Sequence, residues 1–172
     1  MILNKYNIVL EPLQIDKLET VRLWRNKEQV SRFMEFKEEI SKEQQITWFQ
    51  NINPKNEYYF IIQKDAVSIG LIHINKVNRE EKNAEVGLFI GESNYAGTGI
   101  TIGASLNLLD FAFENLNLKE VFAKINNENI NAVKYNSFLG FTLSHPLNSD
   151  FSLWKLTKEA YEISKPKLVN YI

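Results

Sequence analysis

Residues 84–101 read AEVGLFIGESNYAGTGIT, and they predict a strand, a glycine-bearing turn and the start of a helix. The helix that opens at Gly99 has apolar residues at three- and four-residue steps, which are Ile102, Leu106, Leu109 and Phe113. Because the turn directly precedes a helix, several of its backbone N–H groups lack partners and lie at the positive end of the helix dipole. The stretch therefore predicts an anion site, most often one for phosphate.

A second strand and helix follow the first pair. Residues 121–125 read VFAKI, residues 129–133 read NINAV, and residues 139–141 read LGF. Asn129 suits a helix N-cap, and Gly140 suits a left-handed helix end. Two strands that are each followed by a helix mark the place where α/β folds build ligand sites.

Composition narrows the class of protein. The chain has 172 residues, 44% of them hydrophobic and 24% charged, with a net charge of -1, which is typical of one globular domain over residues 1–172. No basic block predicts nucleic-acid binding, and no apolar run predicts a signal peptide or a membrane span. Cysteine is absent and only His73 and His145 are present, so we expect no disulfide and no metal site. A soluble, cytoplasmic location is the expectation.

The remaining sequence predicts a mixed α/β domain with the element order β-α-α-β-β-β-α-β-α-β-β. Ser41 and Gln44 form a capping-box pattern at the start of one helix. The other expected elements are a strand at 8–12, a helix at 15–27, an antiparallel pair at 58–63 and 68–76, and a strand at 151–156 after a turn around Pro146.

The two motifs resemble those of the GNAT (Gcn5-related) N-acetyltransferase superfamily. Its pyrophosphate loop, Gln/Arg-x-x-Gly-x-Gly/Ala, matches residues 96–101, with Gly99 at the central glycine and departures at Ala96 and Thr101. Its Asn-x-x-Ala-Ile…Leu-Gly-Phe segment matches residues 129–141 at the same spacing. The resemblance implies an α/β (α+β) fold with a mixed, mostly antiparallel sheet of about seven strands, four helices, and fourth and fifth strands that splay apart.

The resemblance also implies acetyl-CoA as cosubstrate, without a metal. The residues that it assigns to the coenzyme are Leu88, Phe89, Ile90, Ala96, Gly97, Thr98, Gly99, Ile100, Thr101 and Asn129. Ala96 lacks the long polar side chain that the family often uses at that position. The backbone amides of the turn do not depend on side chains, and Gly97 keeps the approach to them open.

Within the superfamily, the Trp24-Arg25-Asn26 triplet resembles the N-acetyltransferases of UDP-4-amino-4,6-dideoxy sugars in pseudaminic acid synthesis. That branch neighbours the ribosomal-protein N-terminal and the spermidine acetyltransferases. The residues that we expect around the acceptor are Arg25, Asn26, Met34, Gln45, Trp48 and His73, with the Arg25 fork placed to pair with a diphosphate. Structural roles stay open: Trp48 as core, Arg25 in an internal ion pair, and His73 as a strand histidine. The nucleotide-sugar enzymes have a histidine where Gln45 stands here.

Acetyl transfer to an amine needs a neutral amine, a polarised thioester carbonyl and a proton for the leaving thiolate. Glu85 matches the family's general-base position, with a surface glutamate as the alternative. Backbone N–H groups near residues 88–90 would polarise the carbonyl. The family's usual tyrosine acid falls at Asn136, and Tyr135 lies one residue early, about 100° around the helix. We therefore expect solvent or a group such as Tyr95 to protonate the thiolate, and Tyr135 to be a packing residue.

The leading hypothesis is an acetyl-CoA-dependent N-acetyltransferase whose small-molecule acceptor is a nucleotide-linked amino sugar. The alternatives are a protein N-terminal or a polyamine acetyltransferase, the latter using Glu35, Glu38 and Glu39, and a non-catalytic acyl-CoA-binding module. Dimers are common in the family, so a homodimer is one expected assembly.

Overall fold

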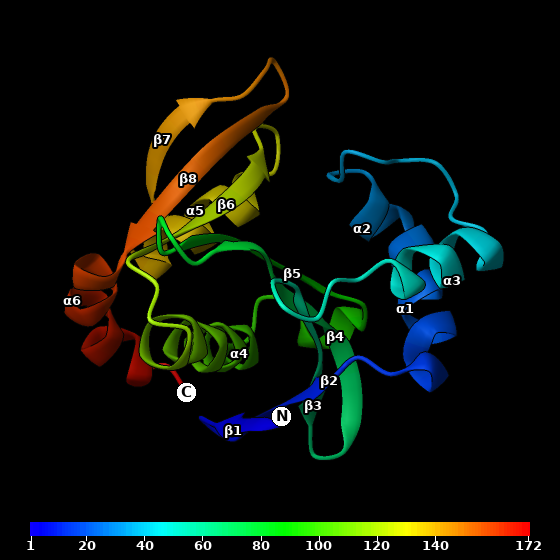
Figure 1. Cartoon of the computed structure of the whole chain (residues 1–172), viewed down its shortest axis with the longest axis horizontal. Coiled ribbons are helices and arrows are strands. Elements are labelled where there is room, and N and C mark those ends of the chain that lie inside the picture. Colours follow the sequence, from blue (N-terminus) through cyan, green and yellow to red (C-terminus); the bar gives the residue numbers. More distant parts are fainter.

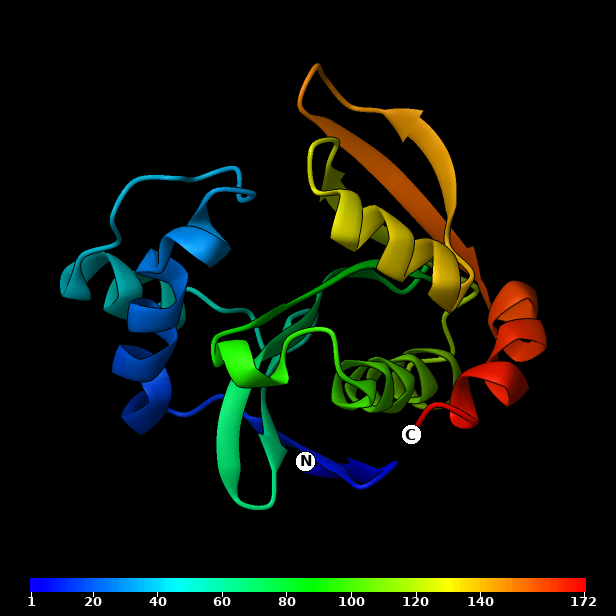
Figure 2. The ribbon, with the colours of Figure 1, turned by 180° about the vertical axis from the view of Figure 1, so that it is seen from behind.

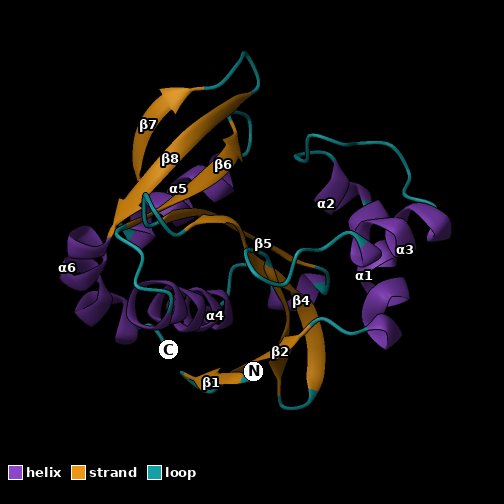
Figure 3. Cartoon of the chain, in the orientation of Figure 1, coloured by secondary structure: helices purple, strands orange, loops and turns teal.

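The computed structural model of the chain describes residues 1–172 and contains one eight-stranded sheet with helices on both faces (Figures 1 and 3). In chain order the strands are β1 (Leu3–Lys5), β2 (Ile8–Pro12), β3 (Tyr58–Lys64), β4 (Val67–Asn78), β5 (Asn83–Ile90), β6 (Glu120–Asn126), β7 (Thr142–Pro146) and β8 (Phe151–Thr157). Their order in the sheet is β1-β2-β3-β4-β5-β6-β8-β7. Only β5 and β6 are parallel neighbours; every other pair is antiparallel.

Six α-helices cover the sheet. They are α1 (Leu18–Asn26), α2 (Glu28–Ser31), α3 (Lys42–Gln50), α4 (Gly99–Asp110), α5 (Ile130–Leu139) and α6 (Lys158–Val169). Short 3₁₀ turns, η1 (Ile15–Lys17) and η2 (Ser93–Tyr95), precede α1 and α4, and a π-helical turn, η3 (Phe111–Asn115), extends α4. None of the helices is both long enough and apolar enough to cross a membrane.

The two faces of the sheet have cores of different size. Alternation along β3 and β4 places Phe60 and Ile72 in a cluster of 25 buried residues against α4, and Ile61 and Leu71 in a cluster of six against α1. Figure 2 shows α4 and α5 together on the side of the larger cluster. The helices α1–α3 lie on the other side, so ligands on the two faces would meet different helices.

The expected fold class is confirmed, with small differences in the number of elements. The sheet has eight strands instead of about seven, and there are six α-helices instead of four. β1 was missed because it has three residues and is joined to β2 through Tyr6 and Asn7, both at φ 57° without a glycine to mark the turn. α6 was missed because it contains Pro166, and only Tyr161 and Leu168 of its residues are buried.

Local predictions near the site hold. The capping box at the start of α3 is present, with Ser41 Oγ accepting from the Gln44 amide at 3.2 Å and Gln44 Oε1 accepting from the Ser41 amide at 2.7 Å. Asn129 caps α5, and Gly140 ends it at φ 104°. These signals are local in sequence, so they predict helix ends without knowledge of the tertiary fold.

Candidate functional site

The site begins where β5 and β6 separate. The two strands pair only over residues 83–85 and 120–122, and beyond this point no ladder joins them. A cavity of about 400 Å³ fills the gap and is lined by residues 86–90 of β5 and 123–126 of β6. This confirms the expected splay of the fourth and fifth predicted strands. The edge of β5 that faces the gap therefore has backbone groups without strand partners.

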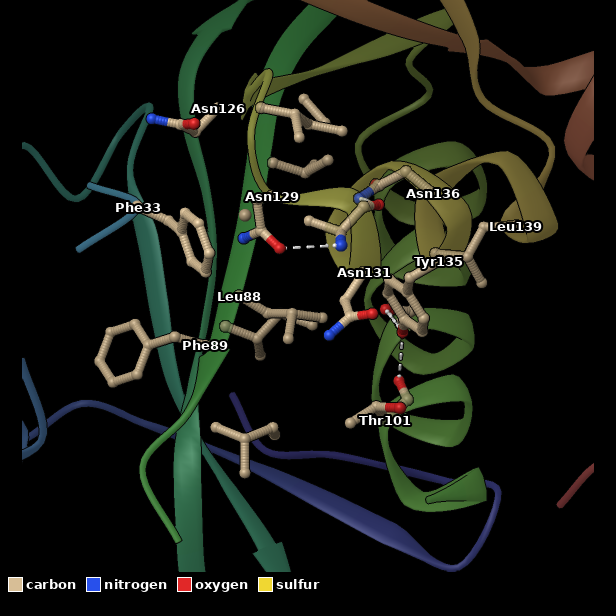
Figure 4. A pocket seen from close by; sticks show the side chains of 18 of the residues that line it. Phe33, Leu88, Phe89, Thr101, Asn126, Asn129, Asn131, Tyr135, Asn136 and Leu139 are labelled. Atoms are coloured by element: carbon tan, nitrogen blue, oxygen red, sulfur yellow. Dashed lines mark hydrogen bonds between the residues drawn. The ribbon is translucent and has the colours of Figure 1, made fainter. Parts of the chain in front are cut away.

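α5 forms one wall of this cavity (Figure 4). Asn129 lines the cavity, and its Oδ1 accepts from the Ala132 amide at 3.1 Å, which fixes the first turn of the helix. Asn131 and Asn136 also line the cavity. The helix thus turns a row of amide side chains towards the gap between the strands.

The glycine turn lies at the end of the cavity beside α4. Ala96, Gly97 and Thr101 line the cavity, while Thr98, Gly99 and Ile100 do not. Gly97 has φ 73°, and a Cβ built on it would meet nothing within 4 Å. Thr98 Oγ1 donates to the Tyr95 carbonyl at 2.8 Å, which holds the turn closed.

The backbone amides of this turn are free to bind an anion. None of the hydrogen bonds within the turn is donated by the backbone amides of residues 97–100. These amides lie at the start of the twelve-residue helix α4, so the positive end of its dipole lies beside them. The turn therefore fits the pyrophosphate of coenzyme A, and the adjoining cavity between β5 and α5 fits the pantetheine arm of the same molecule. No group of three or more His, Cys, Asp or Glu side chains is arranged to hold a metal ion.

Tyr135 and Asn136 occupy different environments although they are neighbours. Tyr135 Oη donates to the Thr101 carbonyl at 2.8 Å and shares a 2.7 Å hydrogen bond with Ser105 Oγ, so it joins α5 to α4. Burial raises the pKa of Tyr135 to about 12. Asn136 Nδ2 donates to the Ala132 carbonyl at 2.9 Å and keeps one further proton. Tyr135 therefore packs α5 against α4, and it also lines the cavity.

Glu85, the candidate base, stands at the point where the strands separate. The strand register places Glu85 and Gly87 on the face that α1 covers. Glu85 does not line the cavity, and its carboxylate pairs with Lys76 Nζ at 2.6 Å. Tyr95, the candidate acid towards the thiolate, also lies outside the cavity lining.

His73 lies on the same face as Glu85, in register with Gly87, which lines the cavity. Its ring stacks on Tyr59 with centroids 5.2 Å apart, and no hydrogen bond involves either ring nitrogen. A Cβ on Gly87 would come within 2.6 Å of His73 Cε1, so only a glycine at this position leaves room for the imidazole ring. Burial lowers the pKa of His73 to about 4, which leaves the imidazole neutral at pH 7.

The expected acceptor residues separate into two groups. Met34 lines the cavity. Asn26 and Gln45 have structural roles instead, since both polar side-chain atoms of Asn26 form hydrogen bonds with the backbone of Ile40 and Gln45 is buried. The Trp48 ring packs edge-on against Tyr59, with ring centroids 4.9 Å apart, which is a packing contact.

Arg25 lies in the last turn of α1, just before α2, whose residues Gln29 and Val30 line the cavity. It makes no ion pair, its Nη1 is buried without a hydrogen-bond partner, and burial lowers its pKa. Asn75 Oδ1 is the other buried side-chain atom without a partner, and it lies on the same face of the sheet as His73. This face thus holds an unused donor and an unused acceptor.

The sequence did not single out several residues of the cavity. Gln29, Val30 and Phe33 reach it from the segment around α2, and Asn131 and Ser105 reach it from α5 and α4. Asn131 had a readable signal, since it lies in the first turn after the Asn129 cap. Gln29 and Val30 had none, because the four-residue helix α2 has no periodicity to show which of its sides faces the gap.

The charge of the cavity lining is distinctive. Seventeen of the 27 lining residues are hydrophobic, and none is Asp or Glu. The only charged side chain is Lys124, which pairs with Glu35 at the rim. The lining thus offers amide and hydroxyl groups but no carboxylate to a ligand.

Comparison with known proteins gives a family match and several relatives. The family model described as an acetyltransferase (GNAT) domain matches residues 7–142. Spermidine N(1)-acetyltransferase of Escherichia coli strain K12 is 26% identical over 150 residues, covering 86% of this chain and 80% of that protein. Acetyltransferase PseH of Campylobacter jejuni is 27% identical over 132 residues, covering 76% and 80%. Spermidine N-acetyltransferase from Vibrio cholerae, in complex with CoA and spermine, shares the fold at a TM-score of 0.81 and 20% identity, covering 92% of this chain and 99% of that one.

Proposed function

The chain belongs to the GNAT acetyltransferase family, and we propose that its acceptor is the amine of a nucleotide-linked deoxyamino sugar. The transfer of an acetyl group from acetyl-CoA to an amine is the activity of the family. The choice of acceptor is the proposal, and it rests on the charge of the site.

The absence of carboxylates from the cavity lining carries this proposal. A polyamine is a multiple cation, and a site that desolvates such a cation needs acidic partners. An acceptor linked to a diphosphate needs a cation instead, and the buried Arg25 guanidinium has no internal carboxylate to neutralise it. Asn75 Oδ1 is also buried without a partner, although it lies outside the cavity lining, and we propose that it accepts from a hydroxyl or amine of the sugar.

We assign coenzyme binding to backbone groups. The amides of residues 97–100 bind the pyrophosphate at the start of α4, and Asn129 orients the first turn of α5 along the arm. The unpaired edge of β5 at residues 88–90 donates N–H groups to the carbonyl oxygen. Acetyl-CoA supplies the activated acetyl thioester.

Glu85 is the proposed proton acceptor. Because its carboxylate lies outside the cavity lining and pairs with Lys76, we expect it to act through a water molecule. His73 is the reserve base, since its imidazole is neutral and its ring nitrogens are free of hydrogen bonds.

We expect no side chain to act as acid towards the thiolate. The Tyr135 hydroxyl is already donated to Thr101, and Asn136 can offer the sulfur only its second Nδ2 proton. A hydrogen bond from Asn136 would stabilise the thiolate, and solvent would protonate it.

A polyamine acceptor is the second candidate, and the spermidine acetyltransferases among the relatives favour it. Glu35, Glu38 and Glu39 lie between α2 and α3 and are exposed. Glu35 pairs with Lys124, which reduces its value to a cation. Protein N-termini remain a third class of acceptor to test.

The test is thiol release from acetyl-CoA with UDP-4-amino sugars, spermidine and N-terminal peptides as separate acceptors. Turnover with the amino sugars at a kcat/KM at least tenfold above that for spermidine is the expected result. Preference for spermidine would overturn the acceptor assignment. With the preferred acceptor, Glu85→Gln and His73→Gln then identify the base by which one removes the acid limb of the pH profile.

A further inference from the structure

One ion pair spans the rim of the cavity, between Lys124 of β6 and Glu35 of the segment after α2. No other hydrogen bond or ion pair joins residues 14–57, which contain α1–α3, to residues 120–172, which contain β6–β8. Figures 1 and 2 show these two parts on opposite sides of the gap that opens beyond β5. The pair is therefore the one polar link between the parts of the chain on either side of the cavity.

The register of the sheet places Lys124 on the acceptor face. Phe122 is in register with Glu85, and alternation along β6 puts Lys124 on the same face as Phe122. Lys124 Nζ lies 5.4 Å from the centre of the Phe151 ring, and this contact keeps the ammonium beside β6 when Glu35 moves away. Because Lys124 is the only charged residue of the cavity lining, the one charge that an acceptor meets there is positive.

Glu35 is a partner that a ligand can replace. Its side chain is 62% exposed, whereas that of Lys124 is 28% exposed. An ion pair with so exposed a member contributes little to stability, because water already solvates the carboxylate and salt screens the attraction. A phosphate oxygen can take the place of the Glu35 carboxylate, since both are anionic oxygens that accept a charge-assisted hydrogen bond from the ammonium. The displaced carboxylate returns to water.

We propose that Lys124 is a specificity-determining residue through which the site selects acceptors of negative charge, and that Glu35 occupies its ammonium until the acceptor binds. The ammonium attracts an anionic acceptor and repels a cationic one, and its pair with Glu35 withholds a rim carboxylate from a cation. The inference rests on the proposed function, because a diphosphate-linked acceptor carries the charge that Lys124 binds. A diphosphate has more than one negative charge, so Lys124 can act together with Arg25.

The test is the change in kcat/KM for two acceptors of opposite charge, a UDP-4-amino sugar and spermidine, at low ionic strength. Lys124→Gln should lower kcat/KM for the UDP-linked sugar about tenfold and raise that for spermidine about threefold, because it removes the positive charge and frees Glu35. Glu35→Gln should shift both acceptors the opposite way, since it leaves the ammonium without a competitor. The Kd of coenzyme A should stay the same in both variants, and the shifts should shrink in high salt.

The ion pair of Lys155 with Glu120 provides the matched control. It also joins a lysine and a glutamate of the sheet, and neither residue lines the cavity. Lys155→Gln changes the net charge by the same amount as Lys124→Gln, and it should leave both acceptors unchanged. Where an acceptor is not turned over, its Kd for the chain loaded with coenzyme A replaces kcat/KM in the comparison.

The preference of the parent tests the proposed function, whereas the opposite shifts in the variants test the role of Lys124. A parent that prefers spermidine would overturn the acceptor assignment, and opposite shifts in its variants would still support Lys124 as the residue that reads charge. Equal changes for both acceptors would mean that the pair only holds the two parts of the chain together, and would overturn the inference. A weaker Kd for coenzyme A in Lys124→Gln, or equally large shifts in Lys155→Gln, would overturn it as well.

Discussion

The two faces of the sheet hold their helices by different means. On the coenzyme face, α4 is part of the 25-residue core and ends at Asp110, whose carboxylate is 1% exposed and receives hydrogen bonds from Lys5, Tyr6, Tyr161 and Lys165. On the acceptor face, α1 rests on a six-residue cluster. Two hydrogen bonds of 2.7 Å, from Trp24 Nε1 to Glu92 and from Lys27 Nζ to the Gly91 carbonyl, tie the end of α1 to the segment after β5.

This difference matches the role that we propose for each face. The coenzyme face presents backbone amides in a fixed arrangement, and such a site works only if α4 and α5 do not move. The acceptor face presents side chains, and it keeps Arg25 Nη1 and Asn75 Oδ1 without internal partners. A large core with a satisfied polar network thus supports the coenzyme face, and a small core with unused polar atoms supports the acceptor face.

Removal of the Asp110 carboxylate should have the largest effect on the coenzyme face. Asp110→Ala leaves the buried Tyr161 hydroxyl without its 2.7 Å partner and removes one of the two ion pairs of Lys165, while the pair with Glu114 stays. We expect a loss of about 3 kcal/mol in the free energy of unfolding. The loss is no larger because Lys5 and Lys165 can still reach water. Urea unfolding measures this free energy. The matched variant on the acceptor face is Glu92→Ala, which should lose about 1 kcal/mol. Equal losses would remove the contrast between the faces.

The same network predicts a dependence on pH. Burial alone would raise the pKa of Asp110, but the hydrogen bonds from Lys165, Tyr161, Tyr6 and Lys5 together lower it below its ordinary value of 3.8. A carboxyl whose folded pKa is lowered adds stability above its unfolded pKa and loses it as the pH falls through the folded pKa. The parent should therefore be more stable than Asp110→Asn at pH 7, and this advantage should shrink below about pH 4.

The sequence predicted the local structure of the face that we assign to the coenzyme better than that of the face that we assign to the acceptor. The turn at 96–101, the Asn129 cap and the Gly140 helix end are local patterns whose geometry the backbone alone determines. The offset of about 100° between Tyr135 and Asn136 did not separate a packing residue from a cavity residue, because both line the cavity. Asp110, Lys165 and Tyr6 meet only through the tertiary fold, so no local pattern could have shown their network.

On the acceptor face, the sequence allowed each polar residue either a structural or a ligand-binding role. Only the packing of the folded chain decides between the two roles. Asn26 bonds to Ile40 and Gln45 is buried, whereas Arg25 on the same segment as Asn26 finds no partner. A sequence shows that a guanidinium is present, but not whether a carboxylate lies within reach. Arg22, three residues earlier, pairs with Glu19 at 2.9 Å.

Replacement of Arg25 tests this contrast between neighbouring arginines. Arg25→Met should raise the KM for a UDP-linked acceptor about tenfold to a hundredfold, because a diphosphate loses a desolvated charge partner. It should leave the Kd of coenzyme A unchanged and should not lower thermal stability, since the arginine has no internal partner to lose. Steady-state kinetics and thermal unfolding measure both.

Arg22→Met is the control for this variant. It removes the pair with Glu19 and a 3.0 Å hydrogen bond to the Ile40 carbonyl, so it should lower stability without changing KM. The opposite pattern, with Arg25→Met less stable and equally active, would make Arg25 a structural residue and leave the acceptor face without its anion partner.

The smallest effect is expected at the start of α3. Ser41→Ala removes the Oγ that accepts from the Gln44 amide and breaks one half of the capping box, at a cost of about 1 kcal/mol. Because α3 contributes Trp48 to the acceptor face and nothing to the cavity wall at α5, the Kd of coenzyme A should not change. Denaturant unfolding together with coenzyme titration would check both parts. A weaker Kd in Ser41→Ala would mean that the small core transmits strain through β4 and β5 to the larger one, and the two faces would then have to be treated as one cooperative unit.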